Sequence, residues 1–407
     1  MKYFTINKNY FGSKSHYICD TETETLIKTE ELPDNILSLS SKKFNDIASV
    51  YCLKIPEPIP DNIRKAYRAI QNPLLANHTP WEFCIPKEAY TNIINEFAKT
   101  VSRQLKNINS YEYYDNIFLK TEKVLNSLSE AKVNKDLIFE NLDKSFIPNE
   151  NGFLEKTIYS RTNSITGRLT VSSGPRILNL KKEYKKDLFV SRFGKDGALF
   201  TLDFKCLEPR ILRALVEPYQ SEERDIYKKI QLDTVELMPN ITRSLAKDVI
   251  LSSIYGSKVS SIAERTKKSE DEIEKLFKYI SDYFNFDELK LKLINQYEKE
   301  NRIFIENFYG RRISTEEAQP YMLINYFTQS TGVDVSLLGF LNIIEYLEEL
   351  GRLNDTVFPL FIIHDALILD FHKEAFHLIP TLCKLGSKEI IKFEEITFFL
   401  EHEKLSQ

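Results

Sequence analysis

Apolar strands that end near an aspartate constrain the fold of this chain more than any other feature. GALFTLDF (197–204) has the apolar run of a buried strand, with Asp203 near its end. PLFIIHDALILDF (359–371) predicts two apolar strands around a polar tip that contains Asp365, which indicates a β-hairpin, although His-Asp-Ala is not a standard two-residue turn. Taken singly, each aspartate is better interpreted as a solvated residue at a strand end.

Brought side by side, the two aspartates would make a metal site. A carboxylate at the end of a buried strand is costly unless a cation or another partner neutralises it. Asp203 and Asp365 together would present the oxygen ligands that Mg²⁺ prefers. Two metal ions about 3.5–4 Å apart activate a 3′-hydroxyl group and stabilise a leaving pyrophosphate.

The segment RSLAKDVILSSIYG (243–256) carries cations at helical spacing. Four side chains follow one another at intervals of four residues, namely Arg243, Lys247, Leu251 and Tyr255. On a helix they share one face, which suits a nucleoside triphosphate because the cations meet the phosphates and the later residues meet base and sugar. Alone, an amphipathic helix with two ordinary surface cations is the better interpretation.

Periodicity and punctuation predict the remaining elements. Helices are expected at 209–217, 241–256, 269–284 and 321–350, and a long helical stretch is expected from about 62 to 150. The patches HYIC (16–19) and ASVYCLKI (48–55) indicate strands, and the proline-rich IPEPIPDN (55–62) indicates a boundary.

Composition limits the function classes. The chain has 407 residues and a formal net charge of -4, which argues mildly against a nucleic-acid binder, although binding needs only a local basic groove. Its five cysteines form no short paired spacing, so neither a zinc site nor a disulfide framework is expected. Without an apolar signal core or a run of about 20 apolar residues, we expect no membrane span and a cytoplasmic location, or the host cytoplasm if a phage encodes the chain.

Six segments, in order, resemble DNA polymerase I-like (family A) DNA polymerases. LDFKCLEPR (202–210), RSLAKDVILSSIYG (243–256) and IHDA (363–366) resemble the three polymerase motifs of that family. Three others resemble further family segments: TGRLTVSSGPRILNL (166–180), IENFYGRRI (305–313) and NYFTQSTGVD (325–334). One match would be weak, but six in the family order identify the region from about 150 to 375 as a member.

The resemblance implies a fold. It predicts a mixed α+β right hand with palm, fingers and thumb subdomains. The N-terminal segment 1–60 has no assigned role, and residues 61–150 form the thumb-like helical region. Residues 151–407 form palm and fingers, with the fingers inserted at about 218–300.

The resemblance also implies a function and roles. The chain would be a template-directed DNA polymerase that adds dNTPs to a primer 3′ end with two Mg²⁺ ions, for which Mn²⁺ could substitute. Asp203 and Asp365 would hold the metals. Arg243 and Lys247 would bind the triphosphate, and Lys247 would also protonate the leaving pyrophosphate.

Other implied roles concern the base, the sugar and the primer–template. Leu251 and Tyr255 would lie at the nascent base pair, and Glu208 would exclude a 2′-hydroxyl from beneath the sugar and hydrogen-bond Tyr255. Four residues would contact primer–template: Arg168, Asn325, Gln329 and His364. Each of these four has an ordinary alternative, such as general phosphate binding by Arg168 or a solvated helix face at Asn325 and Gln329. We expect a monomer, with residues 1–55 or the thumb as the site of any replisome or processivity partner.

The chain departs from the family pattern at positions that bear on activity. Ala366 stands where the family has Glu, Leu251 where it has Phe or Tyr, and Ser252 where it has Gly. An aliphatic side chain packs less well on a base than an aromatic ring, so nucleotide selection would be looser. Two alternatives stay open: a catalytically impaired, polymerase-derived nucleic-acid-binding or replisome protein, and a polymerase that uses an RNA template. Glu208 argues against ribonucleotide use.

A proofreading exonuclease is not expected. The pair Asp20-x-Glu22 in CDTETET (19–25) and the stretch YEYYD (111–115) resemble exonuclease motifs. The stretch between Asp20 and Gly167 is too short to hold that domain together with a thumb. We therefore expect neither proofreading nor a 5′-nuclease domain.

Overall fold

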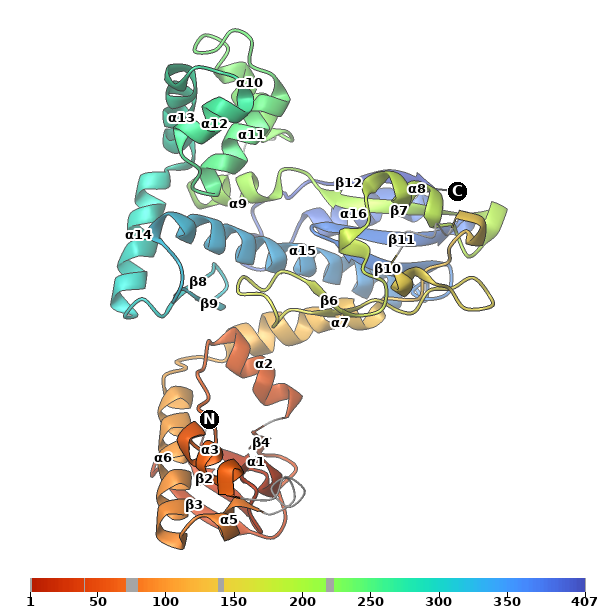
Figure 1. The fold of residues 1–407 in the computed structure, drawn as a ribbon. Coiled ribbons are helices and arrows are strands. Elements are labelled where there is room, and N and C mark those ends of the chain that lie inside the picture. Colours follow the sequence, from red (N-terminus) through yellow and green to blue (C-terminus); the bar gives the residue numbers. More distant parts are fainter. Residues whose placement is uncertain (1, 40, 71–79, 138–142, 217–222, 407) are drawn as a thin grey trace. The chain divides into compact units, whose positions relative to one another are not determined.

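The chain divides into two structural units, Met1–Tyr114 and Asp115–Gln407 (Figure 1). The computed structural model describes residues 2–39, 41–70, 80–137, 143–216 and 223–406. The division falls inside the range 61–150 that the sequence predicts as one thumb-like region. The assignment of ranges to subdomains stays a prediction.

The smaller unit combines a short-stranded sheet with helices. Its elements are β1 (Tyr3–Ile6), α1 (Lys8–Phe11), β2 (His16–Asp20), β3 (Thr25–Thr29), β4 (Leu37–Ser38), α2 (Lys42–Val50), α3 (Asp61–Ile70), α5 (Trp81–Cys84) and α6 (Lys87–Lys106). The strands are ordered β3-β2-β1-β4. Helix α6 contacts β2 and β3, and its buried residues Ile94, Phe97 and Val101 recur at the helical spacing that covers a sheet. The strand predicted at HYIC is confirmed as part of β2.

The strand predicted at 48–55 is wrong. Residues 48–50 end helix α2, whose N-cap Ser41 accepts a hydrogen bond from the Phe44 N–H at 3.1 Å. Phe44, Ile47 and Val50 are buried at intervals of three residues. The capping serine and this helical period outweigh the apolar cluster, because the cluster lacks the alternation of a strand.

The larger unit contains the elements that position the candidate site. They are α7 (Leu119–Ser127), β5 (Ile158–Ser160), β6 (Thr170–Ser173), α8 (Lys182–Leu188), β7 (Gly197–Phe204), α9 (Leu207–Val216), α10 (Ile226–Asp233), α11 (Arg243–Ile254), α12 (Val259–Thr266), α13 (Glu270–Phe284), α14 (Phe286–Lys299), β8 (Phe304–Glu306), β9 (Arg312–Ser314), α15 (Leu323–Glu349), β10 (Val357–Ile363), β11 (Ala366–His372), α16 (Ile379–Ser387) and β12 (Leu400–Ser406). The π-helix Tyr113–Phe118 spans the division between the units.

A four-stranded antiparallel sheet forms the base of this unit. Its order is β10-β11-β7-β12, so the predicted strand 197–204 and the predicted hairpin are both confirmed. β7 and β11 are the inner strands. β11 is buried along six of its seven residues, as expected for a strand covered on both faces.

The predicted helices are confirmed with small boundary shifts. They correspond to α9, α11, α13 and α15, and Glu217, the last residue expected in the first of them, lies outside the described residues. Helix α13 begins with a capping box in which Ser269 and Glu272 satisfy each other's backbone N–H groups. Helices α10 to α14 share a buried core and occupy most of the range 218–300, whose first residues lie outside the described ones.

Helix α15 is the long buried helix of the larger unit. It is buried along most of its length and contacts α7, α9, α14 and α16 (Figure 1). A helix that is apolar on nearly all sides is typical of a protein interior. Across the described ranges, no helix combines the length and the apolar character that a bilayer crossing requires.

The helical stretch expected as far as residue 150 ends earlier. Helix α7 ends at Ser127, and Leu128 is extended with ψ 147°. Beyond it, Lys132 and Val133 form isolated β-bridges to Phe153 and Phe189. At these residues, pairing with distant backbone replaces the predicted helix; residues 71–79 and 138–142 of the predicted stretch lie outside the described residues.

Candidate functional site

Strand ends bring Asp203 and Asp365 together. Asp203 is the penultimate residue of β7, and Asp365 lies in the turn between β10 and β11. Asp203 lies opposite Ala366 in the antiparallel β7–β11 pair, and the Phe204 N–H donates to the Asp365 carbonyl oxygen at 3.3 Å. The two backbones are therefore neighbours.

The turn that carries Asp365 has only two residues. Ile363 pairs with Ala366, which leaves His364 and Asp365 as the connection. His364 has φ 56°, in the left-handed region that non-glycine residues seldom adopt. This conformation lets a sequence that is not a standard hairpin turn close one, and strained residues of this kind cluster at functional sites.

The two carboxylates fit a divalent cation. Burial raises the pKa of Asp365, while His364, Arg168 and Lys247 lower it in part. A cation beside the carboxylate would remove the cost of charging it there. No third metal-ligating side chain forms a cluster with them within the described ranges, so water and phosphate oxygens would complete the shell, as Mg²⁺ prefers.

Helix α11 presents its cations to the same place. Thr242 caps the helix by accepting a hydrogen bond from the Leu245 N–H at 3.1 Å, so Arg243 is its first residue. Arg243 and Lys247 lie near the Tyr227 ring, at 5.3 and 5.8 Å from its centroid. Because aromatic faces attract cations, the ring holds both groups on one side of the helix.

Arg243 is already paired. Its Nε donates to Asp225 Oδ2 at 2.8 Å, and this ion pair lowers the pKa of Asp225 against the effect of partial burial. Asp225 also caps α10 by accepting from the Lys228 N–H. A phosphate that binds Arg243 would therefore compete with the Asp225 carboxylate.

One cavity of about 360 Å³ contains nearly all the residues that the sequence predicted. Its lining includes Arg168, Asp203, Glu208, Arg243, Lys247, Leu251, Tyr255, Gln329, His364 and Asp365. Asn325 is the exception, because it lies one turn before Gln329 on α15 and does not line the cavity.

Glu208 and Tyr255 form the hydrogen bond that the resemblance implied. The Tyr255 hydroxyl donates to Glu208 Oε2 at 3.2 Å. Burial raises the pKa of Glu208, and burial together with Glu208 raises the pKa of Tyr255 to about 12. The phenol is therefore neutral at physiological pH and remains a donor.

Sequence reasoning missed Tyr227 and Asp225. Tyr227 lines the cavity and Asp225 binds Arg243, and both belong to the start of α10. An Asp before an apolar helix is a recognisable N-cap. The ion pair between Asp225 and Arg243 joins two helices, so no pattern within either helix predicts it.

Comparisons with known proteins bear on the family and the fold of the chain. The family model for DNA polymerase family A matches residues 95–392. Among solved structures, the chain is similar to the POL domain of Pol1 from M. smegmatis in complex with DNA primer-template and dNTP, with a TM-score of 0.59 and 12% sequence identity. That likeness covers 99% of this chain and 95% of the other. No curated protein sequence matches the chain.

The two findings support different parts of the conclusion. The structural likeness, at low identity, shows the mixed helix-and-strand fold of a polymerase domain. The family match extends over more than half of the chain and includes both strand-end aspartates and the cations of α11. The chain therefore belongs to DNA polymerase family A and is a DNA-directed DNA polymerase.

Proposed function

We propose that the cavity is the nucleotidyl-transfer site, where the chain adds dNTPs to the 3′ end of a primer paired with a DNA template. The observation that carries this proposal is the meeting of two strand-end carboxylates and two helix cations in one cavity. Fixed charges of both signs stabilise charge that develops during phosphoryl transfer. Primer–template and dNTP are also the ligands in the solved mycobacterial complex.

Asp203 and Asp365 are the proposed ligands of two Mg²⁺ ions, with Mn²⁺ as a substitute. Bound there, the ions would supply activation of the primer 3′-hydroxyl and stabilisation of the pyrophosphate. The raised pKa of Asp365 supports this role, because burial outweighs the neighbouring charges and leaves the charged form of the carboxylate only partly compensated.

Arg243 and Lys247 are the proposed triphosphate ligands. Arg243 exchanges Asp225 for phosphate, and this exchange keeps a charged partner on its guanidinium group in both states. Lys247 is also the proposed proton donor to the leaving pyrophosphate. Leu251 and Tyr255, farther along the same face, contact the nascent base pair.

Glu208 is the proposed selector of deoxyribose. Its hydrogen bond to Tyr255 holds the carboxylate side chain in place at the cavity wall. A 2′-hydroxyl would meet this fixed group, and a ribonucleotide would therefore fit poorly. The primer–template contacts are proposed for Arg168, Gln329 and His364 in the cavity and for Asn325 beside it.

We also propose that the chain lacks proofreading. The Asp20 carboxylate accepts hydrogen bonds from the backbone N–H groups of Glu22 and Thr23, at 2.8 and 3.1 Å. These bonds lower its pKa and shape the turn between β2 and β3. The bonds support a structural role for Asp20 in place of a catalytic one.

Primer extension tests the proposal. A labelled primer on a DNA template is incubated with Mg²⁺ and dNTPs, using the wild-type chain, Asp203→Ala and Asp365→Ala. We expect extension by the wild type and a loss of at least about 10³-fold in each variant, in line with the removal of a large electrostatic stabilisation. Asp196→Ala is the control, because Asp196 is an exposed carboxylate next to the other end of β7.

Further arms separate the finer claims. Ribonucleotides are expected to extend poorly, and an RNA template tests template choice. A mismatched primer without nucleotides is expected to stay intact, and shortening that disappears in Asp20→Ala would refute the lack of proofreading. Extension that survives in Asp203→Ala or Asp365→Ala would refute the metal-ligand roles.

One observation favours a second function. Ala366 places a methyl group opposite Asp203, where the resembled family has a carboxylate, so the site has fewer acidic groups than usual. A polymerase-derived protein that binds primer–template without extending it would fit this site. Binding without extension under Mg²⁺ or Mn²⁺ would establish this second function, and restored extension in Ala366→Glu would assign the cause.

A further inference from the structure

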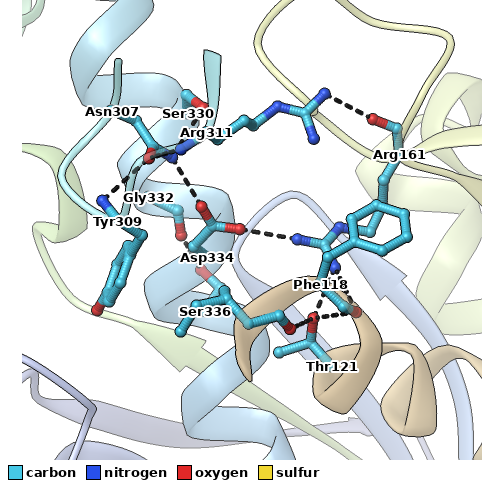
Figure 2. Close-up of polar contacts among 11 residues, drawn as sticks. Phe118, Thr121, Arg161, Asn307, Tyr309, Arg311, Ser330, Gly332, Asp334 and Ser336 are labelled. Carbon is cyan, nitrogen blue, oxygen red and sulfur yellow. Dashed lines mark hydrogen bonds and ion pairs between the residues drawn. The ribbon is translucent and has the colours of Figure 1, made fainter. Parts of the chain in front are cut away.

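A buried ion pair joins three segments of the larger unit. Arg161 and Asp334 are 2% and 1% exposed, and Arg161 Nη2 donates to Asp334 Oδ1 at 2.7 Å. Arg161 Nη1 also donates to the Thr121 hydroxyl of α7 at 2.6 Å, and its guanidinium group lies 4.6 Å from the centre of the Phe118 ring (Figure 2). One side chain therefore connects the start of α7, the segment after β5, and α15.

The second carboxylate oxygen of Asp334 binds a fourth segment, the turn after β8. Asn307, which follows β8, donates through Nδ2 to Asp334 Oδ2 at 2.7 Å and to the Ser330 hydroxyl at 3.0 Å (Figure 2). Its Oδ1 accepts from the Arg311 N–H at 2.9 Å. Separating the buried Arg161–Asp334 pair would leave a charge without its partner, which favours this arrangement over others.

Arg311 connects this network to the loop from Arg161 to Gly167, which precedes Arg168. It is 2% exposed, and its Nη2 donates to the Arg161 carbonyl oxygen at 3.1 Å. Its guanidinium group also lies against Gly167, where a Cβ atom would come within 2.8 Å of the Cζ atom. Gly167 has φ 77°, a conformation that favours glycine, and a side chain at this position would also displace the Arg311 guanidinium group.

The loop from Arg161 to Gly167 is thus held at both ends. The next residue, Arg168, lines the cavity, and its charge offsets part of the rise in pKa that burial causes at Asp365 and Glu208. Gln329 lines the same cavity from α15, five residues before Asp334.

We infer that Arg161, with Asp334 and Arg311, is a positioning residue that sets Arg168 against α15 for binding the primer–template. This inference rests on the proposed function, because it assigns Arg168 to the nucleic acid. Phosphate contacts position a protein on its duplex, so a displaced Arg168 weakens binding without removing any group from the cavity.

The test compares conservative changes in two ion pairs. Arg161→Lys keeps a cation for Asp334 but loses the fork that reaches both α7 and α15. Arg192→Lys is the matched control, because Arg192 binds the buried Asp370 at 3.3 Å and a backbone carbonyl oxygen at 2.6 Å, outside the cavity lining. Each change is made alone and with Arg168→Ala, and fluorescence anisotropy gives the Kd for a labelled primer–template at fixed salt.

We expect Arg161→Lys and Arg168→Ala each to weaken binding about tenfold, and the combined variant to bind within about twofold of Arg168→Ala alone. Arg192→Lys should bind like the wild type and add nothing to Arg168→Ala beyond its own small effect. Thermal unfolding of each variant shows whether a loss of binding follows a loss of stability.

Arg311→Lys provides a second route if Arg161→Lys does not fold. It removes the guanidinium group from beside Gly167 and leaves the Arg161–Asp334 pair intact, and we expect the same loss and the same lack of additivity. Two results would overturn the inference. One is that the fold-losses in affinity multiply when Arg161→Lys or Arg311→Lys is combined with Arg168→Ala. The other is that Arg161→Lys and Arg192→Lys lose equal affinity. Wild-type binding by Arg168→Ala would instead refute the proposed role of Arg168 itself.

Discussion

Glu208 shows how burial sets the chemistry of one side chain in the cavity. Burial raises the pKa of its carboxyl group, and the Tyr255 hydroxyl and Arg168 reverse only part of that effect. The folded chain therefore holds the Glu208 proton more tightly than the unfolded chain, whose carboxyl titrates near 4.5. The stability that Glu208 contributes is lost as pH rises from that ordinary value through the raised folded pKa.

Glu208→Gln is expected to stabilise the chain at neutral pH. The amide keeps an acceptor for Tyr255 and has no charge to bury, so its unfolding midpoint should exceed that of the wild type at pH 8. The difference should shrink as the pH falls toward 4.5, because a carboxyl with a raised pKa takes up its proton increasingly over that range in the folded state. Thermal unfolding across this pH range in EDTA measures it.

Glu317→Gln is the control, because Glu317 is exposed. A difference between Glu208→Gln and wild type that stays constant with pH, or that grows toward acid, would contradict the assignment of the pH dependence to Glu208.

At the scale of elements, the edge strand β10 is held from outside its sheet. The Tyr159 hydroxyl of β5 donates to the Ile362 carbonyl oxygen at 2.7 Å and accepts from the Ile362 N–H at 3.0 Å. Tyr159 is buried, which raises the pKa of its phenol. The tyrosine therefore completes the outer edge of the strand just before His364 and Asp365.

Tyr159→Phe is expected to cost about 1–3 kcal/mol of unfolding free energy, because it leaves both backbone groups of Ile362 buried without this partner. Since β10 leads into the Asp365 turn, kcat for primer extension should fall more than KM for dNTP rises. Urea unfolding and steady-state kinetics measure the two effects.

Tyr309→Phe is the matched variant. Tyr309 is buried and donates to the Ile391 carbonyl oxygen at 2.9 Å, away from the hairpin. It should lose stability and keep kcat. Equal kcat in both variants would refute the link between Tyr159 and the turn.

At the scale of the whole molecule, the candidate site belongs to one of the two units. Every lining residue of the cavity lies in Asp115–Gln407. Met1–Tyr114 has its own sheet and buried residues, including Phe97, which packs edge-on against Phe11. Units with separate cores unfold separately unless their interface is large.

Calorimetry is expected to resolve two transitions. Phe97→Ala should lower the midpoint temperature of the smaller unit's transition alone. The cavity that it leaves should reduce the unfolding free energy of that unit by about 3–5 kcal/mol. Tyr159→Phe should move only the other. A single transition that both variants shift together would show that the units unfold as one.

Local patterns in the sequence determined much of the site. An apolar run with an aspartate next to its last residue, two apolar runs around a polar tip, and four side chains at intervals of four are each encoded within a few neighbouring residues. Their consequences were predictable because strand and helix periods repeat over that same short range. β7, the β10–β11 hairpin and the cavity-facing side of α11 follow from them.

Only the tertiary structure decided which distant residues meet. Arg161 binds Asp334, 173 residues away, and Tyr159 binds Ile362, 203 residues away. These outcomes depend on how elements pack, and periodicity within one element carries no information about the neighbour against which that element is buried.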